Sequence, residues 1–249
     1  MVLSDKEVVS ICHLRKAPNV SSKLKQTIKT MNEELKKQEE DSFTYHFFFN
    51  HGIYDELKHY EDLINETELF LTTKVIAMES STDEEIIDER FGKKIQYEGI
   101  FPMILWKSLF LSTYFLLENS LDQICKNLRK SNSYNLTLKD ISGNGIFRSS
   151  LYLKKVCNIK EPFGSQTWTE VNDFNKIRNV FVHSDGIISK SATETIKVCE
   201  KYNQIQLNEY DEDNFSIQID SEFCKYSLTK IEKLINEVHT GMRKERSSH

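Results

Sequence analysis

The sequence predicts a mainly α-helical, all-α type of protein: an antiparallel helical bundle with a small β-hairpin near its C-terminal end. Only 8 glycines and 3 prolines occur in 249 residues, too few for the frequent turns of an all-β domain. Hydrophobic residues make up 39% of the chain, enough to bury a core. Several segments also repeat apolar residues at helical spacing, behind residues that cap helices.

The first third of the chain predicts helices separated by one ambiguous segment. Ser4 and Glu7 have the spacing of a capping box, and residues 21–41 repeat apolar residues at helical intervals. Residues 43–54 are rich in aromatic side chains and fit neither the helical nor the strand pattern. A long helix is predicted over residues 55–79.

Two further helices are predicted before residue 131. Thr82 and Glu85 open a short helix that ends near Gly92, and Pro102 suits the first turn of a long helix that runs to about residue 130. Residues 100–117, which include the start of this helix, contain 13 apolar residues in 18, close to the length of a membrane span. Because Lys107 interrupts the apolar run and polar residues follow it, we favour a buried core helix over a transmembrane one.

The second half predicts shorter elements and one strongly marked helix. Thr167 and Glu170 form a capping box before a helix over 168–184, and Gly186 supplies its stop. Around it the sequence predicts a polar linker over 131–145 with one helical turn at 138–141, a helix over 146–158, a helix over 192–201, a β-hairpin over 204–220 and a closing helix over 223–243.

Charge, cysteines and the N-terminal segment narrow the class of protein. The net charge of -5 argues against a uniformly basic, nucleic-acid-binding surface. The five cysteines are odd in number and form no C-x-x-C pair, so neither a disulfide framework nor a thiolate zinc site is predicted. The first residues lack the pattern of a secretory signal, and we expect a cytoplasmic protein.

The residues with the clearest chemical character lie at the end of the helix over 168–184. Arg178, Asn179 and His183 occupy its last two turns, just before Gly186. Asn179 and His183 share a helical face, whereas Arg178 lies about 140° away from His183 around the helix. Two copies of this helix end, facing each other across a dimer axis, would bring the groups together more easily than one chain.

The motif Arg178-Asn179-x-x-x-His183 resembles the R-x4-H signature of the HEPN superfamily, whose helical domains include many toxin and antiviral-defence ribonucleases. The resemblance is strong over roughly 165–187 and architectural over about 97–245. It implies a HEPN-like domain over residues 96–249, preceded by a helical region of unknown role over residues 1–95 that is able to pack on the bundle.

The resemblance implies a metal-independent endoribonuclease that uses the RNA 2′-OH as nucleophile and leaves a 2′,3′-cyclic phosphate. His183 would transfer the proton, Arg178 would stabilise the phosphate charge and Asn179 would orient His183 or the phosphate. Because some HEPN toxins use a carboxylate on the preceding long helix, Glu118 is a further candidate, expected to pair with Arg178; a solvated surface glutamate is the alternative.

A basic segment lies between the two helices that carry these residues. Between Cys125 and Lys160, eight basic residues stand against the single acid Asp140, so the acidic total of the chain conceals a local positive charge. RNA would need such counter-charge, and Tyr134, Phe147 and Tyr152 could stack bases. The residues predicted to bind RNA are Lys126, Arg129, Lys130, Lys154 and Lys155.

Metal and other catalytic sites are weakly supported. His51, Asp55 and His59 are spaced four residues apart, but Gly52 interrupts the helix that would align them. Ser184 and Asp185 beside His183 lack the context of a nucleophilic serine. We therefore expect no metal ion and no cofactor.

Two interpretations remain open. The first is a homodimeric ribonuclease with a composite active site, acting as a toxin or antiviral-defence effector under the control of an antitoxin or regulatory partner. The second is a non-catalytic helical module that binds RNA, a nucleotide or a protein through Arg178 and the basic segment.

Overall fold

The computed structural model describes residues 26–27, 29–33, 49–79 and 87–247. Residues 26–27 and 29–33 are helical, within the segment predicted to be a helix. The helix predicted near Ser4 and the capping box at Thr82 and Glu85 lie outside the described residues.

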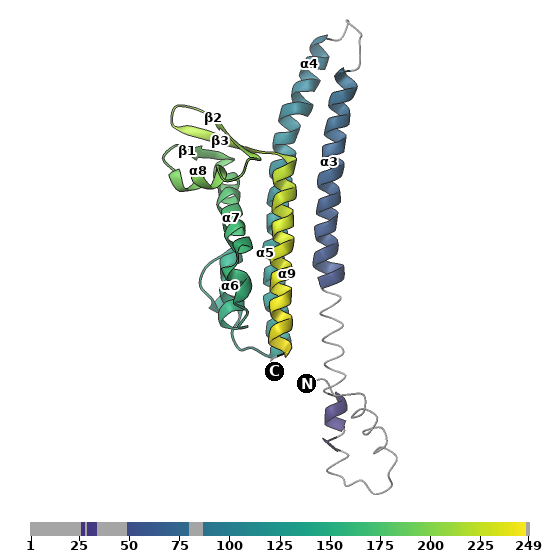
Figure 1. Cartoon of the computed structure of the whole chain (residues 1–249), viewed down its shortest axis with the longest axis vertical. Coiled ribbons are helices and arrows are strands. Elements are labelled where there is room, and N and C mark those ends of the chain that lie inside the picture. Colours follow the sequence, from purple (N-terminus) through teal and green to yellow (C-terminus); the bar gives the residue numbers. More distant parts are fainter. Residues whose placement is uncertain (1–25, 28, 34–48, 80–86, 248–249) are drawn as a thin grey trace.

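Three long helices lie side by side and form the framework of the molecule (Figure 1). They are α3 (Asp55–Glu79), α5 (Phe101–Asn132) and α9 (Ser221–Ser247). The helix predicted over 55–79 is confirmed, and the segment before it ends in a π-helical turn, Phe49–Tyr54. The closing helix extends further in both directions than predicted, because the residues on either side of 223–243 also have helical backbone.

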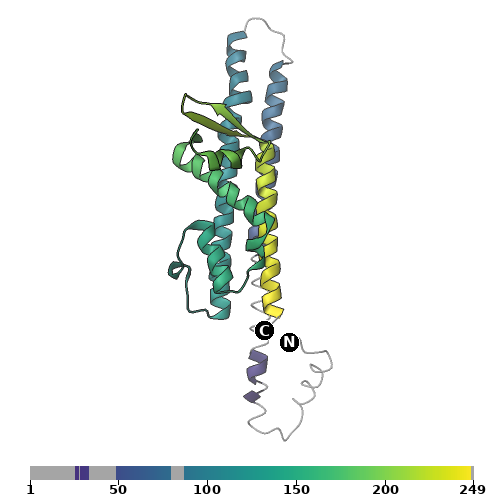
Figure 2. The ribbon, with the colours of Figure 1, turned by 60° about the vertical axis from the view of Figure 1, so that its left-hand side comes forward.

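The long helix predicted to begin near Pro102 is confirmed as α5, which has Pro102 in its first turn. The prediction that the preceding helix ends near Gly92 is wrong. Helix α4 (Ile87–Ile95) passes through a π-helical turn (Gln96–Ile100) directly into α5, and the ribbon continues without a break (Figure 2). Proline lacks a backbone N–H and crowds the preceding turn, and the wider π-helical turn just before it provides the space. The predicted domain boundary at residue 95 falls inside this continuous helix.

One hydrophobic core joins the helices. Phe110 of α5 is fully buried, with its ring centroid 5.2 Å from that of Phe223 in α9 and 6.4 Å from that of Phe174 in α7 (Gln166–Ser184). Ile64 of α3 and Leu117 of α5 are also fully buried in the same cluster. The described part of the N-terminal region therefore shares its core with the rest of the bundle.

The segment Phe91–Asn132 is long and apolar enough to cross a membrane by length and composition alone. In this structure 39% of its most apolar 18-residue stretch is buried inside the protein. The Lys107 ammonium within it forms an ion pair at 2.6 Å with Asp185, the residue that follows the helix Gln166–Ser184.

A second layer covers one side of α5 (Figure 2). It consists of α6 (Gly145–Lys155) and α7 (Gln166–Ser184), which pack on α5, and α7 also packs on α9. The single helical turn predicted at 138–141 is present as a 3-10 turn, Leu138–Asp140. A second 3-10 turn, Glu161–Gly164, precedes α7.

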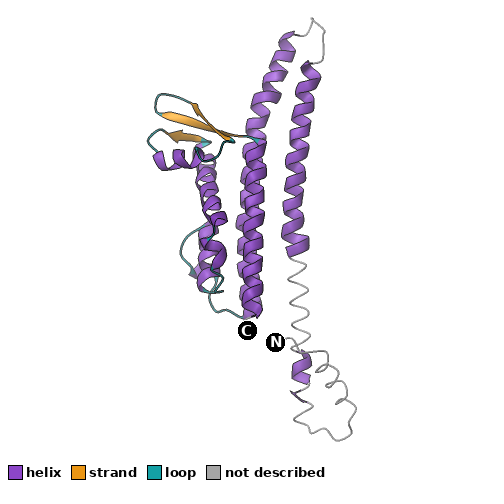
Figure 3. Cartoon of the chain, in the orientation of Figure 1, coloured by secondary structure: helices purple, strands orange, loops and turns teal. Residues whose placement is uncertain are grey.

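A three-stranded antiparallel sheet follows α7 (Figure 3). The predicted hairpin is confirmed as β2 (Ile205–Glu209) and β3 (Asn214–Ile219), with Leu207 opposite Ile217. A third strand that the sequence does not predict, β1 (Ile187–Ser189), pairs with β3 in the order β1-β3-β2. The predicted helix over 192–201 is α8 (Thr193–Cys199). The fold is thus mainly α-helical with a small sheet near the C-terminus, as the sequence predicts.

Candidate functional site

Helix α7 carries the predicted motif, and its N-terminus differs from the prediction. The Ser165 hydroxyl accepts a hydrogen bond from the backbone N–H of Trp168 at 3.1 Å, so Ser165 is the N-cap. The capping box predicted at Thr167 and Glu170 is wrong. Both residues are already inside the helix, and their side chains bond α9, with Thr167 donating to Glu237 at 2.8 Å. Ser165 therefore supplies the local cap, and Thr167 and Glu170 form tertiary contacts instead.

Arg178 lies at the contact between α7 and α5. Its guanidinium is 3.6 Å from the Glu118 carboxylate, and the two side chains are 18% and 21% exposed. The guanidinium carbon also lies 5.0 Å from the centroid of the Phe115 ring and 5.8 Å from that of Tyr114. The structure thus brings Arg178 and Glu118 together, in a half-buried setting where charge interactions are stronger than in water.

The Glu118 carboxyl is confined from two sides. Burial raises its pKa, the Arg178 guanidinium opposes this rise, and the Asp122 carboxylate one turn away adds to it. On its other side the carboxylate lies against Gly145, the first residue of α6. Glu118 is therefore a carboxylate held in place between three helices, rather than the solvated surface glutamate of the alternative.

Asn179 contacts Arg178. The Asn179 side-chain oxygen accepts a hydrogen bond from Arg178 Nη1 at 3.0 Å, and its nitrogen donates to Asn175 at 3.2 Å. The HEPN resemblance implies that Asn179 orients His183 or the phosphate; in this structure Asn179 binds the Arg178 guanidinium instead. Asn175 was not identified from the sequence, although its position one turn before Asn179 is the signal that could have pointed to it.

His183 is exposed in the last turn of α7. The helix stops directly after it, because Asp185 and Gly186 adopt positive φ values of 51° and 88°. Within the described part of the chain His183 forms no hydrogen bond or ion pair, and the contacts of Arg178 do not include it. Within one chain, therefore, the His183 imidazole is exposed to solvent and does not contact the Arg178 guanidinium.

The residues predicted to bind RNA lie on α5 and α6, beyond Glu118 along both helices. Four of them are exposed: Lys126, Arg129, Lys130 and Lys155. Lys154 is half-buried, with its ammonium 5.9 Å from the centroid of the Phe163 ring.

The aromatic residues suggested for base stacking differ in their accessibility. Tyr152 cannot stack a base, because it is fully buried and its hydroxyl donates to the Leu136 carbonyl at 2.9 Å. Phe147 is 47% exposed and packs edge-on against Trp168, and Tyr134 is half-buried. Only Phe147 therefore offers a substantially open ring.

The described residues also include metal-ligating side chains, the acid Asp185 and four cysteines. Among the described residues, no three His, Cys, Asp or Glu side chains are grouped so as to hold a metal ion. Asp185 pairs with Lys107, which holds its pKa below the usual range. The four described cysteines are buried free thiols, and burial raises the pKa of Cys199 to about 11. They are therefore unreactive at neutral pH.

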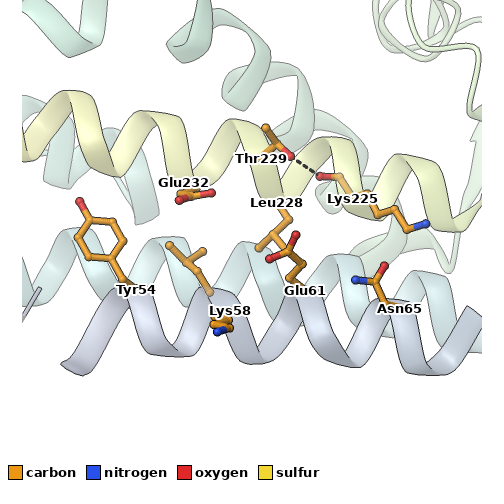
Figure 4. Close-up of a pocket in the computed structure, with 9 residues that line it drawn as sticks. Tyr54, Lys58, Glu61, Asn65, Lys225, Leu228, Thr229 and Glu232 are labelled. Atoms are coloured by element: carbon orange, nitrogen blue, oxygen red, sulfur yellow. Dashed lines mark hydrogen bonds between the residues drawn. The ribbon is translucent and has the colours of Figure 1, made fainter. Parts of the chain in front are cut away.

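Two cavities lie away from these residues. One of about 360 Å³ separates α9 from α3 and the turn before it (Figure 4). Its floor includes the buried Leu57 and Leu228, and Figure 4 shows Tyr54, Glu61 and Glu232 around it. A second, of about 300 Å³, lies between α3 and the start of α5. The predicted site residues line neither cavity.

The candidate site is thus a surface of α5 and α7 formed by Arg178, Asn179 and Glu118, with His183 on the adjoining helix end. No family model, curated protein or solved structure matches this chain.

Proposed function

We propose that this protein is a metal-independent endoribonuclease of HEPN type, which cleaves RNA by attack of the 2′-OH and leaves a 2′,3′-cyclic phosphate and a 5′-hydroxyl. The observation that supports it most is the arrangement on α7. A half-buried guanidinium is held by one carboxylate and one amide, and an exposed imidazole lies five residues further along the same helix.

The chemistry requires few groups, because RNA supplies its own nucleophile. His183 is open to solvent and can accept the 2′-OH proton or donate one to the leaving 5′-oxygen. Arg178 donates hydrogen bonds to the non-bridging oxygens and stabilises the extra negative charge of the transition state. Asn179 and Glu118 hold the guanidinium, and Glu118 contributes no direct step in this scheme.

The site is completed by a second copy of the chain in this proposal. His183 and Arg178 do not touch within one chain, and the two helices that carry the site, α5 and α7, also carry exposed apolar side chains. Phe115 of α5 contacts Arg178, and Val182 lies one turn after Arg178 in α7; both side chains are exposed. Further exposed apolar residues on the same stretch of α5 and the turn before it are Ile100, Met103 and Ile104.

Dimerisation is tested by placing a charge on this surface. Ile104→Asp and Val182→Asp should yield monomers by light scattering and lose cleavage together. Leu69→Asp, at a 61% exposed apolar position of α3, is the matched control and should leave both unchanged. A monomer that cleaves RNA as well as the dimer would contradict the composite site.

The activity itself is tested with total RNA in the presence of EDTA. Wild-type cleavage should persist, and Arg178→Ala and His183→Ala should each lower it by about 10²- to 10⁴-fold. Matched controls are Lys176→Ala, an ion-paired lysine of the same helix, and His59→Ala, an exposed histidine of α3. Cleavage that needs a metal ion, or that survives in both site variants, would refute the proposal. Unchanged cleavage and folding in Glu118→Gln would remove Glu118 from the site.

The second candidate function is a non-catalytic module that binds RNA, a nucleotide or a protein. The exposed cations Lys126, Arg129, Lys130 and Lys155 favour it, because they supply counter-charge whether or not His183 is catalytic. Binding of RNA without cleavage, weakened by substitution of these cations, would support it.

The cellular role is proposed from the HEPN resemblance alone. It is that of a toxin or antiviral-defence effector in the cytoplasm, restrained by an antitoxin or regulatory partner. Induced expression should arrest growth with the wild type and not with His183→Ala.

A further inference from the structure

A chain of three side-chain hydrogen bonds leads from Arg178 into the core. Arg178 Nη1 donates to Asn179 Oδ1 at 3.0 Å, and Asn179 Nδ2 donates to Asn175 Oδ1 at 3.2 Å. Asn175 Nδ2 then donates to the Tyr114 hydroxyl at 2.6 Å, which crosses from α7 to α5. We call these four residues the amide relay.

The chemistry of arginine determines the direction of the relay. A guanidinium can only donate, so Asn179 must present its oxygen to Arg178. Its nitrogen is then the donor to Asn175, which must present an oxygen in turn. The nitrogen of Asn175 is left to donate to Tyr114, whose hydroxyl accepts. Each amide therefore has one orientation, set by the charge at the end of the relay.

The relay ends on a rigid anchor. Tyr114 is fully buried in the core. Its ring centroid also lies 5.8 Å from the Arg178 guanidinium carbon, so the last residue of the relay directly contacts the first. Asn175 is half-buried on the side of α7 that faces α5. Tyr114 has no access to a substrate.

The guanidinium depends on this relay for its orientation. Its Nε is buried and has no hydrogen-bond partner among the described residues. The contact with Glu118 is 3.6 Å long, beyond the distance of a good hydrogen bond. The bond to Asn179 is therefore the one hydrogen bond that Arg178 makes within the described part of the chain.

We propose that Asn175 and Tyr114 are positioning residues that hold the Arg178 guanidinium in the orientation that meets a phosphate, so that they control the rate of RNA cleavage without touching RNA. The inference rests on the proposed function. A misplacement of about 1 Å in a group that stabilises a transition state can lower a rate by roughly 10²-fold. Loss of the relay leaves Asn179 without its partner in α7, so the guanidinium that Asn179 binds is no longer fixed in one orientation.

The test uses two relay variants and one control in the full-length protein. Asn175→Leu removes the amide at similar size, and Tyr114→Phe removes the anchor hydroxyl. Asn172→Leu is the matched control, since Asn172 is a half-buried asparagine of the same helix whose side-chain oxygen has no partner among the described residues. Cleavage of an RNA oligonucleotide and the melting temperature are measured for each.

The relay variants should lower kcat by roughly 10- to 100-fold with little change in KM, and Asn172→Leu should not. The double variant Asn175→Leu/Tyr114→Phe leaves no buried hydroxyl without a partner, and only the Asn179 nitrogen loses its acceptor. Its melting temperature should therefore be no lower than that of Asn175→Leu alone, while kcat stays low. In an Arg178→Lys background, Asn175→Leu should lower kcat only slightly further, because lysine lacks the fork that the relay orients. If Asn175 and Tyr114 had a purely structural role, the losses of kcat would be additive with that of Arg178→Lys, and each loss would follow the fall in melting temperature.

The outcomes separate this inference from the proposed function. If Arg178→Ala is inactive and both relay variants cleave at the wild-type rate, the inference is overturned and the function stands. If the wild type cleaves no RNA, the function fails, and a crystal structure of Asn175→Leu decides the inference. A guanidinium displaced from Asn179 supports positioning, and an unmoved one overturns it.

Discussion

The carboxylate of Glu118 occupies the place that a β-carbon on Gly145 would need. Gly145 begins α6 with a φ of 51°, and its bare backbone lets the carboxylate approach the helix. On its other side the same carboxylate lies 3.6 Å from the Arg178 guanidinium. The glycine at the start of α6 therefore leaves the space in which the Glu118 carboxylate lies beside Arg178.

Substitution of Gly145 by alanine should disturb the site beyond its effect on the backbone. A positive φ costs an alanine about 1–2 kcal/mol, and the new methyl group would also displace Glu118. Gly143→Ala is the control, because Gly143 has a φ of 96° and its β-carbon would approach only the Arg148 backbone, at 3.8 Å. We expect both variants to lose stability in denaturant unfolding and only Gly145→Ala to lose cleavage as well. Equal loss of cleavage in both would contradict this.

Combining Gly145→Ala with Glu118→Ala separates the steric clash with the Glu118 carboxylate from the cost of the backbone conformation. In a Glu118→Ala background the space beside residue 145 is empty, so Gly145→Ala should cost only the backbone term. The cycle of four proteins should then give a coupling free energy of about 1 kcal/mol or more in unfolding. Additive losses would show that the carboxylate moves aside without strain.

Helices with a complete local signature could be predicted from the sequence. Residues 55–79 repeat apolar side chains at helical intervals, and α7 ends where Gly186 permits a left-handed turn. The break between Gly92 and Pro102 was wrong because a π-helical turn accommodates the proline, and nothing local reveals it. The strand β1 is three residues long and exists through its pairing with β3, 27 positions away at Ile188 and Phe215.

The residues of the candidate site also differ in whether the sequence alone could reveal them. Arg178, Asn179 and His183 are neighbours in one helix, so their spacing is visible in the sequence. Asn175 and Tyr114 are 61 positions apart, and Tyr114 stands in an apolar run where an aromatic residue indicates only core packing. The separation of His183 from Arg178 within one chain follows from their angle around the helix, which the sequence gives in advance.

Glu118→Gln should change how stability depends on pH. Because the pKa of Glu118 is raised in the fold, mainly by burial, the native state holds this proton more tightly than the unfolded chain. Ionisation of Glu118 then disfavours folding as the pH rises through a window that begins near its ordinary value of 4.5. Glutamine does not ionise, so between about pH 4 and 7 the unfolding free energy of the variant should rise relative to that of the wild type.

Chemical denaturation at several pH values measures this difference. Glu61→Gln, at an exposed carboxyl of α3, serves as the control and should follow the wild type. Parallel curves for Glu118→Gln and the wild type would show that Arg178 fully offsets the burial of the carboxylate.

Gly186→Ala should destabilise the end of α7. The φ of 88° disfavours any residue with a β-carbon, and the added methyl would lie 3.2 Å from the Phe181 ring and 3.4 Å from the Ile217 carbonyl oxygen. We expect a loss of about 2–3 kcal/mol in unfolding free energy, since strain and overpacking both contribute. A loss no larger than that of Gly143→Ala would mean that strand β3 yields to the methyl group.

Lys107→Met should loosen the helix end that carries His183 without unfolding the protein. Lys107 is the one cation within the apolar part of α5, and its ammonium binds Asp185 at 2.6 Å, two residues beyond His183. Asp185 is 83% exposed, so the pair contributes little to global stability. It does fix the last turn of α7 to α5, and methionine should make the backbone amides of 180–185 exchange with solvent faster and lower cleavage severalfold.

The pH dependence of this pair has a definite sign. Lys107 lowers the pKa of the Asp185 carboxyl, so the contact is intact at neutral pH and is lost only as the pH falls through that lowered value. A fall in wild-type cleavage between about pH 5 and 8 therefore cannot come from Asp185, and it should persist in Lys107→Met. Lys190→Met, which removes an exposed pair with Glu209 in the sheet, is the matched control and should leave amide exchange at 180–185 unchanged. If amide exchange in Lys107→Met equals that of Lys190→Met, the ion pair does not restrain His183, and the helix end is held by the left-handed turn at Asp185 and Gly186 alone.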